Sequence, residues 1–378
     1  MRLPGERLRG FRLSNRLELA LRRLTLLPQR IAASQSVDAF SFSPAMSAVV
    51  TFGEVMLRLT PPGHLRLAQA RAFEITFGGA EANVAVVLAQ LGASVDYVTR
   101  LPLNDVAQRA IDELKGLGVG VEKIARGGER MGVYFLEQGA SQRGGKVIYD
   151  RAHSAIAEAR TRDFDWDAIL DGAKWFHWSG ITPALSDSAA AITAEACVVA
   201  KRRGVAVSFD LNFRAKLWTP ELAGRSLAPL MPHVDLCVTS AEEARAVFGI
   251  ELAEGNEGRE QEAAQRLQER FGFQKVALTM RRADTADATT WAAMLWDGER
   301  AYFSQSYEIA IVDRVGAGDS FTGALIFALT RGDDPQRAID FAVAASTLKH
   351  TIPGDYALIT LAEVEALAAG GGGGRVQR

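Results

Sequence analysis

Short apolar runs alternate with amphipathic segments along the chain from residue 48 onward. The run at 48–57 has the composition of a strand, and the segment at 81–92 places Val84 and Leu88 on one helical face before Gly92, a common helix stop. The same pattern predicts further strands at 94–101, 175–180, 205–212, 234–240, 275–280 and 290–298, and further helices at 105–118, 189–204, 242–249 and 319–332. Strands that alternate with helices of about ten to fifteen residues form βαβ units. We therefore expect an α/β fold whose central sheet is doubly wound, mostly parallel and flanked by helices.

Two segments interrupt this alternation. Residues 57–77 and 130–150 have the pattern of β-hairpins without intervening helices. We expect them to form a small separate sheet, which serves either as a lid over a cleft or as a dimer surface. An ordinary extension at the edge of the main sheet is the alternative.

Composition excludes several classes of protein. The 378 residues are 48% hydrophobic and 23% charged, with a formal net charge of −2, which suits a globular protein and argues against a nucleic-acid binder with a broad basic surface. Cys197 and Cys237 are the only cysteines, so no disulfide framework is implied and a reducing, cytoplasmic location fits. No apolar run approaches the roughly 20 residues of a membrane-spanning helix. We expect a soluble protein with no membrane or nucleic-acid partner.

The two ends of the chain differ from the rest. Residues 1–45 are rich in Arg and Leu and poor in acidic residues, as in an organelle transit peptide. The alternative is that Met46 is the true start, because an apolar strand pattern follows it directly. The Gly-rich stretch at 371–378 predicts a flexible tail. The folded domain is thus expected to span 46–370.

The stretch "DRVGAGDSFTG" at 313–323 carries the clearest chemistry. A turn of small residues that opens a helix beyond a strand leaves its N–H groups free, and the helix dipole favours an anion there. The amides of Gly316, Ala317 and Gly318 can therefore cradle a phosphoryl group. Asp319 follows at once, either as a simple helix cap or as the base that accepts a proton from an attacking hydroxyl.

A second glycine turn also opens a helix. In "TFGGAEANVAV", Gly78 and Gly79 permit close backbone approach, and Asn83 projects from the first helical turns. One Gly-Gly turn is weak evidence of a site. Two such turns that both open helices indicate two halves of one ligand cleft.

Together, "GGAEANVAVVLAQLGASVDYVTRL" and "DRVGAGDSFTGALIFAL" resemble the two signatures of the ribokinase-like (phosphofructokinase B type) carbohydrate kinases, and the resemblance covers residues 48–375. It implies a ribokinase-like fold with a small β-sheet lid, and a kinase that uses ATP and Mg²⁺, with a monovalent cation as a further candidate. It also implies a homo-oligomer, a dimer or higher, formed through the lid. The GAGD turn is the family's anion hole, and Asp319 is its catalytic base.

Three further stretches are similar to the branch of the family that phosphorylates 2-keto-3-deoxygluconate, "FDLNFRAKLW" at 209–218, "SGITPAL" at 179–185 and "IYDRAHSAIA" at 148–157. The resemblance implies phosphorylation of 2-dehydro-3-deoxy-D-gluconate to its 6-phosphate. It places Gly79, Asn83, Tyr134, Tyr149, Arg151, Arg214 and Asp319 around the sugar acid. The paired N–H groups of a guanidinium suit a carboxylate. Without the family resemblance, Arg151 and Arg214 would be interpreted as surface residues in ion pairs.

The nucleotide side departs from the family's usual pattern. Arg314 stands where a Thr is usual, and Ser240 replaces the Asn of an N-x-x-E element whose Glu243 is retained. The stretch from Thr279 to Trp291 lacks the usual glycines, so the nucleotide-side loop must be built differently. The resemblance still implies that Ser240, Thr279, Arg314, Gly316 and Gly318 contact the nucleotide, with Glu243 holding Mg²⁺ through water.

Two alternatives stay open from the sequence. One is a sibling kinase that acts on a neutral sugar such as fructose or ribose, or on a nucleoside. The other is a catalytically weak sugar-acid binding protein, which the departures at Arg314 and Ser240 motivate. Retention of Asp319 argues against this second alternative, because a binding protein has no need of a general base.

Overall fold

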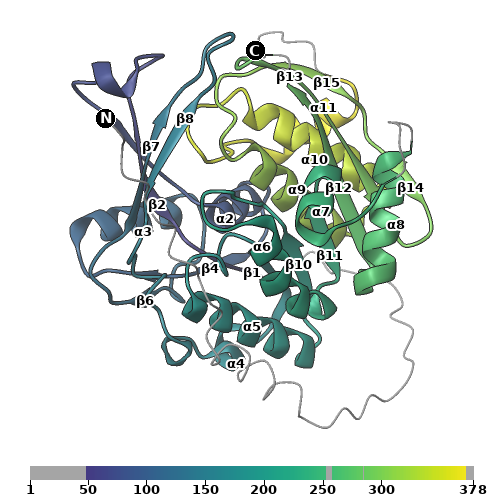
Figure 1. The fold of residues 1–378 in the computed structure, drawn as a ribbon, viewed down its shortest axis with the longest axis horizontal. Coiled ribbons are helices and arrows are strands. Elements are labelled where there is room, and N and C mark those ends of the chain that lie inside the picture. Colours follow the sequence, from purple (N-terminus) through teal and green to yellow (C-terminus); the bar gives the residue numbers. More distant parts are fainter. Residues whose placement is uncertain (1–47, 253–257, 284, 372–378) are drawn as a thin grey trace, which may run out of the picture. The chain divides into compact units, whose positions relative to one another are not determined.

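A nine-stranded sheet forms the centre of the chain in a computed structural model that describes residues 48–252, 258–283 and 285–371 (Figure 1). The strand order is β14-β13-β12-β11-β10-β9-β1-β4, with β15 paired to β13. Six strands are parallel, namely β1 Ala48–Phe52, β4 Val95–Val98, β9 Ala173–Ser179, β10 Ala206–Asp210, β11 Leu236–Thr239 and β12 Lys275–Ala283. The antiparallel strands are β13 Ala288–Trp296, β14 Ala301–Phe303 and β15 Tyr307–Ala310. This arrangement confirms the mostly parallel sheet.

Helices cover both faces of the sheet, because neighbouring residues of each buried strand point to opposite sides. Val49 packs into the core on one face and Val50 into the core on the other. The first face is covered by α2 Ala80–Gln90, α3 Asp105–Gly116, α9 Ala317–Arg331, α10 Pro335–Lys349 and α11 Leu361–Ala368. The second face is covered by α4 Trp166–Ile169, α5 Asp187–Arg202, α6 Pro220–Leu227, α7 Ala241–Phe248 and α8 Arg259–Phe271.

The two helices that open toward the pocket begin without a side-chain cap, as does α8, which begins after Gly258. Side chains cap the first turns of α3, α5, α6, α7, α10 and α11. By contrast, α2 begins after Gly79 and α9 after Gly316, and neither has a side-chain cap. The first N–H groups of these two helices are therefore left for other partners.

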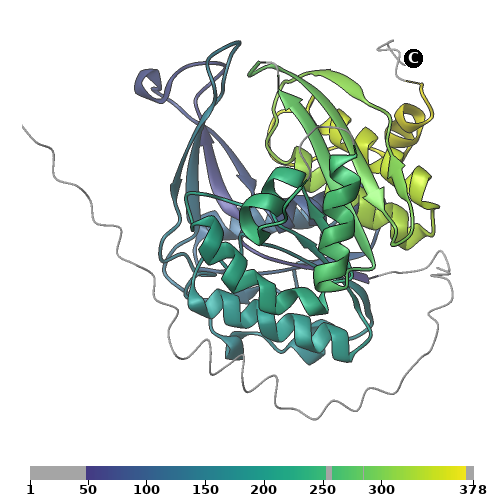
Figure 2. The ribbon, with the colours of Figure 1, turned by 45° about the vertical axis from the view of Figure 1, so that its right-hand side comes forward.

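The segments at 57–77 and 130–150 build a separate four-stranded sheet, which we call the lid sheet (Figure 2). Its strands are β2 Met56–Thr60, β3 Glu74–Gly78, β7 Gly132–Glu137 and β8 Lys146–Asp150. Two antiparallel hairpins, β2/β3 and β7/β8, are joined by the parallel pair β2/β7. The expected separate sheet is thus confirmed.

Two predicted strands are each divided in the structure. The strand expected at 48–57 is β1 in the central sheet and β2 in the lid sheet, because the chain crosses between the sheets at Gly53. A Cβ at Gly53 would lie 2.0 Å from Oε2 of the buried Glu81, so any larger residue at this crossing would force Glu81 to move. The strand expected at 94–101 is β4 followed by β5 Arg100–Leu101, which pairs with β6 Ala125–Arg126 in a two-stranded sheet.

Three short 3-10 turns complete the described elements, Leu67–Gln69, Thr161–Asp163 and Ala228–His233. No helix in the described ranges combines the length and the apolarity needed to cross a membrane. The predictions for the N-terminal extension and for the tail beyond residue 371 concern residues outside the described ranges.

Candidate active site

The turn at Gly316–Asp319 lies at the start of α9 and leaves the amides of two of its residues unused. Gly316 has φ 82°, and a Cβ there would lie 2.0 Å from the carbonyl oxygen of Asp355, so two independent constraints require glycine. The amide of Ala317 donates to the carbonyl of Arg314 at 3.3 Å. The amides of Gly316 and Gly318 donate no hydrogen bond to any described residue. These two are available to an anion.

Gly318 differs from Gly316 in what surrounds it. Its φ is not positive, and a Cβ built on it meets no atom within 4 Å. Gly318 lines the pocket, so a side chain there would occupy ligand space without a clash in the protein itself. This geometry is consistent with the expected role of the small residues, which is to let a ligand approach the backbone.

A pocket of about 530 Å³ lies over this turn, between the lid sheet and the carboxyl ends of the parallel strands. Nearly all of the residues predicted for the site line it: Gly79, Asn83, Tyr134, Tyr149, Arg151, Arg214, Glu243, Thr279, Arg314, Gly316, Ala317, Gly318 and Asp319. Ser240 is not among the lining residues. Its hydroxyl instead accepts a hydrogen bond from the amide of Glu243 at 3.2 Å and caps α7.

Asp319 is placed for proton transfer. Its side chain lies in the pocket, and its Oδ2 accepts a hydrogen bond of 2.6 Å from Nδ2 of Asn83. Burial raises the pKa of Asp319 to about 6, against the opposing effects of the Asn83 hydrogen bond and the Arg214 charge. A carboxylate with such a pKa is ionised near neutral pH and still basic enough to accept a hydroxyl proton.

Two further acids share this end of the pocket. Burial raises the pKa of Asp210 well above its usual range, and the charges of Glu243 and Asp319 raise it further. Burial also raises the pKa of Glu243, while the Arg214 charge lowers it. This concentration of carboxylates favours a bound cation.

These acids suit a Mg²⁺ ion that is coordinated jointly by the protein and the substrate phosphates, rather than one enclosed by protein ligands alone. No described group of three or more His, Cys, Asp or Glu residues has a metal-binding arrangement. Mg²⁺ commonly keeps several waters and uses one or two carboxylates together with substrate phosphates. Glu243, whose Oε1 accepts from the amide of Phe213 at 3.2 Å, and Asp210 suit that mode of binding.

The two arginines predicted to hold a carboxylate have different partners. The Arg151 guanidinium is buried, and its Nε donates to Oε2 of Glu54 at 2.7 Å. Arg151 also lies over the ring of Tyr149, with its guanidinium carbon 5.3 Å from the ring centre. Arg214 is exposed, and its guanidinium forms no hydrogen bond or ion pair with the residues that the structure describes. Of the two arginines, Arg214 is therefore the one whose guanidinium is available to a substrate carboxylate.

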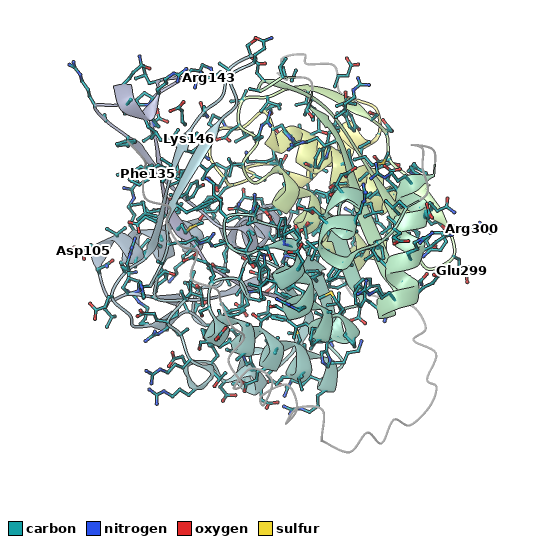
Figure 3. All side chains as sticks on the ribbon, in the orientation of Figure 1. Asp105, Phe135, Arg143, Lys146, Glu299 and Arg300 are labelled. Carbon is teal, nitrogen blue, oxygen red and sulfur yellow. The ribbon has the colours of Figure 1, made fainter. Side chains whose placement is uncertain are left out.

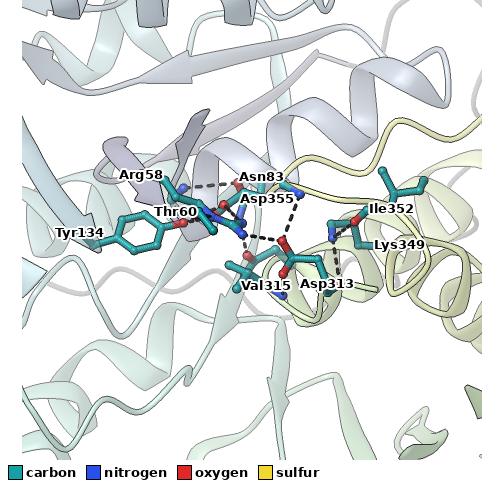
Figure 4. Close-up of polar contacts among 12 residues, drawn as sticks. Arg58, Thr60, Asn83, Tyr134, Asp313, Val315, Lys349, Ile352 and Asp355 are labelled. Carbon is teal, nitrogen blue, oxygen red and sulfur yellow. Dashed lines mark hydrogen bonds and ion pairs between the residues drawn. The ribbon is translucent and has the colours of Figure 1, made fainter. Parts of the chain in front are cut away.

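A buried ionic network beside the pocket was missed by the sequence interpretation (Figure 4). Arg58, on β2 of the lid sheet, pairs through Nη2 with Oδ2 of Asp313 at 2.5 Å and through Nη1 with Oδ1 of Asp355 at 2.8 Å. Tyr134 on β7 donates to Oδ2 of Asp355 at 2.6 Å. The lid sheet is thereby bonded to the segment that leads into the turn at Gly316–Asp319, which we call the anion-binding turn after its expected role. The one signal in the sequence was a charged residue within the apolar run "VMLRL".

The glycine-free stretch after Thr279 is a strand. β12 continues to Ala283 and pairs antiparallel with β13, so Arg281 lies opposite Trp291. A β-hairpin therefore replaces the expected loop, and strand residues need no glycine. Arg314 donates to the carbonyl of Ala286 at 2.6 Å, at the tip of this hairpin.

Asp210 and Asn212 were also missed, although they flank the end of β10 in the quoted "FDLNFR". Asn212 has φ 39°, a left-handed conformation that asparagine tolerates better than most residues. Its Nδ2 lies 3.5 Å from Oδ1 of Asp319. An Asp-x-Asn sequence directly after a parallel strand was the available signal.

Known proteins resemble this chain over nearly all of its described length. Residues 46–360 match the family described as pfkB family carbohydrate kinase. A 2-dehydro-3-deoxygalactonokinase from Haloferax volcanii is 37% identical over 328 residues, 86% of this chain and 98% of that protein. A 2-dehydro-3-deoxygluconokinase from Thermoproteus tenax is 31% identical over 318 residues, 82% of this chain and 90% of that protein.

A solved structure agrees with these sequence matches. The crystal structure of a 2-dehydro-3-deoxygluconokinase from Thermotoga maritima superposes with a TM-score of 0.84 at 50% sequence identity, and the match covers 86% of this chain and 98% of that one. The predicted ribokinase-like fold and kinase activity are confirmed at the level of the family. This chain belongs to the pfkB family of carbohydrate kinases.

Proposed function

We propose that the protein transfers the γ-phosphoryl group of ATP to the terminal hydroxyl of 2-dehydro-3-deoxy-D-gluconate, which yields the 6-phosphate. The observation that carries this proposal is the uncommitted guanidinium of Arg214, which lines the same pocket as Asp319 and the free amides of the anion-binding turn. A sugar acid offers a carboxylate at one end for Arg214 and a hydroxyl at the other for Asp319. The names of the relatives from Thermoproteus tenax and Thermotoga maritima support the same substrate.

Asp319 accepts the proton of the attacking hydroxyl. The hydrogen bond from Asn83 on α2 fixes the orientation of the Asp319 carboxylate. The raised pKa of Asp319 makes this carboxylate a stronger base at neutral pH than an ordinary aspartate. The amides of Gly316 and Gly318 stabilise the negative charge on the phosphoryl group in transfer, and their fixed position at the start of α9 means that little reorganisation is needed. Glu243 and Asp210 would hold Mg²⁺ together with water, and the bound ion would neutralise charge on the phosphate oxygens.

Arg214 sets which hydroxyl reaches the phosphate. A bidentate guanidinium–carboxylate pair fixes both position and orientation of the acid end. Arg151 was predicted to help Arg214 hold the carboxylate. We propose a different role for it, because Glu54 already pairs with its guanidinium. It orients the ring of Tyr149, which lines the sugar side of the pocket.

ADP release with ATP and Mg²⁺ tests the substrate. The panel holds 2-keto-3-deoxygluconate, its galactonate epimer, gluconate, fructose, ribose and adenosine, and the epimer is included because of the Haloferax volcanii relative. We expect the highest kcat/KM on a keto-deoxy acid. Arg214→Gln should lower that value by about 10²-fold, as expected for losing hydrogen bonds to a charged group, and leave slow turnover of neutral sugars unchanged.

The control for Arg214→Gln is Arg266→Gln, because Arg266 forms an exposed ion pair with Glu262 on α8, outside the pocket. It should leave every kcat/KM unchanged. Highest activity on fructose, ribose or adenosine would contradict the sugar-acid assignment but leave the assignment of kinase activity intact. Binding of the acid without turnover would instead favour a sugar-acid binding protein.

A cytoplasmic location stays a prediction from the cysteine content.

We also infer self-association through the outer face of the lid sheet. Ile75, Leu59, Phe135 and Ile148 stand opposite one another across the four strands, and Ile75 and Ile148 are 44% and 41% exposed (Figure 3 labels Phe135). Such an apolar row suits a second copy of the chain. Light scattering should show a dimer or larger assembly for the protein and a monomer for Ile148→Lys.

A further inference from the structure

Lys349 is a fully buried lysine whose ammonium group contacts backbone carbonyls. It is the last residue of α10, and its side chain is 0% exposed. Its Nζ donates to the carbonyl oxygens of Ile352 at 3.0 Å and Asp313 at 3.2 Å (Figure 4). Among the residues that the structure describes, no carboxylate oxygen lies within ion-pairing distance of this nitrogen.

A buried ammonium group without a direct counter-ion is costly, so its retention calls for a reason. Burial lowers the pKa of Lys349 and the charge of Arg58 lowers it further, whereas the charges of Asp313, Asp355 and Asp319 raise it. The positive charge is therefore held by carbonyl dipoles nearby and by carboxylates at longer range. Backbone carbonyls are the ligands with which proteins also hold monovalent cations.

The two carbonyls belong to the segments that build the anion-binding turn. Asp313 begins the segment that leads to Gly316, and its carboxylate accepts from the amides of Val315 at 3.0 Å and Gly354 at 3.1 Å. Ile352 begins the segment that leads to Asp355, whose carbonyl oxygen lies against Gly316. Lys349 thus joins both segments from behind the turn.

We infer that Lys349 supplies a built-in cation behind the anion-binding turn, as a positioning residue, so that this kinase needs no exchangeable monovalent cation. The Nζ of Lys349 already occupies the space beside the carbonyl oxygens of Asp313 and Ile352, so a potassium or ammonium ion has no access to this pair. This inference rests on the family assignment and on the turn, and it does not depend on which sugar is phosphorylated. It takes the place of the monovalent cation considered from the sequence.

Thermal unfolding without substrate tests the inference first. The wild type, Lys349→Ala and Lys349→Met are compared in chloride salts of K⁺, NH₄⁺ and N-methyl-D-glucamine at one ionic strength. Lys349→Ala opens space beside the two carbonyls, so K⁺ or NH₄⁺ should bind there and raise its Tm. The Tm of the wild type and of Lys349→Met, in which the methionine side chain fills the space, should not respond to the choice of cation.

Kinase activity in the same salts gives the second readout. We expect Lys349→Ala to lose about 10²-fold in kcat, comparable to the loss of one donor to a transition-state anion, and to recover in K⁺ or NH₄⁺. Lys349→Met should lose activity without recovery. The wild type should be equally active in all three salts.

Two results would overturn the inference. One is activation of the wild type by K⁺ or NH₄⁺, which would show an exchangeable cation site. The other is an equal loss in both variants that no cation restores in Tm or in kcat, because a lysine that only fills space behaves in that way. Where neither variant folds, the wild-type comparison decides: equal activity in N-methyl-D-glucamine supports the inference, and activation by K⁺ refutes it.

Discussion

Asn83 and Asp319 are joined by a hydrogen bond of 2.6 Å from Nδ2 to Oδ2, although 236 positions separate them in the sequence. Asn83 lies in the first turns of α2 and Asp319 in the first turn of α9, so the bond fixes the two uncapped helix starts relative to each other. The bond also bears on proton transfer, because it stabilises the ionised form of the carboxylate.

The pH dependence of kcat/KM should show an acid limb with a pKa of about 6. Asp319 must be ionised to accept a proton, so activity is full above this pKa and falls about tenfold per pH unit below it. Burial lowers the pKa of His177 to about 3 and that of His350 to about 4, so neither histidine accounts for the limb. A kcat/KM profile that stays flat from pH 8 to pH 5 would contradict this prediction.

Asn83→Ala should move the acid limb to higher pH. The substitution removes the hydrogen bond that lowers the pKa of Asp319, so the carboxyl then protonates more readily. Asn212→Ala is the matched control, because its amide lies 3.5 Å from the other carboxylate oxygen and should shift the limb much less. The pH profiles of both variants check the prediction, and an equal shift in the two would refute it.

Gly316→Ala and Gly318→Ala should separate stability from activity. Gly316→Ala forces a side chain into a left-handed conformation and against the Asp355 carbonyl, so it should cost at least about 1 kcal/mol in free energy of unfolding. Gly318→Ala meets open space, so its stability should stay within about 0.5 kcal/mol of wild type. Its methyl group enters the pocket at the proposed phosphoryl site, so kcat should fall. Urea unfolding and ADP release distinguish the two effects.

Arg58→Met should destabilise the protein by about 3–5 kcal/mol, because it leaves Asp313 and Asp355 buried without their cation. Activity should fall as well, since Asp313 leads into the anion-binding turn. Arg130→Met removes the exposed pair with Asp150 on the same sheet and should cost under about 1 kcal/mol. The free energy of unfolding in urea measures both. Similar small losses for the two variants would show that the buried network contributes little.

The sequence predicted the βαβ order, the separate lid sheet and the two glycine turns, because each depends on local periodicity and turn chemistry. It did not predict that Gly53 divides one apolar run between two sheets, since that requires knowledge of where Glu81 lies. Arg58 was missed for the same reason: its partners, Asp313 and Asp355, are distant in sequence and meet it only in the folded chain.

Arg151 and Arg214 show a further limit of sequence interpretation. Both were expected to hold the carboxylate, and both line the pocket. Spacing cannot tell which arginine already has an acidic partner. Only the fold brings Glu54 to Arg151 and leaves Arg214 uncommitted.

The most direct test of the catalytic role of Asp319 compares turnover and substrate binding in Asp319→Asn. Asparagine keeps the shape but cannot accept the hydroxyl proton, so kcat for 2-keto-3-deoxygluconate should fall by about 10³-fold. Calorimetry should show nearly unchanged affinity for the sugar acid, because the substitution leaves the proposed contact between Arg214 and the carboxylate in place. Turnover close to that of the wild type, or loss of binding in step with turnover, would contradict a kinase in which Asp319 is the general base.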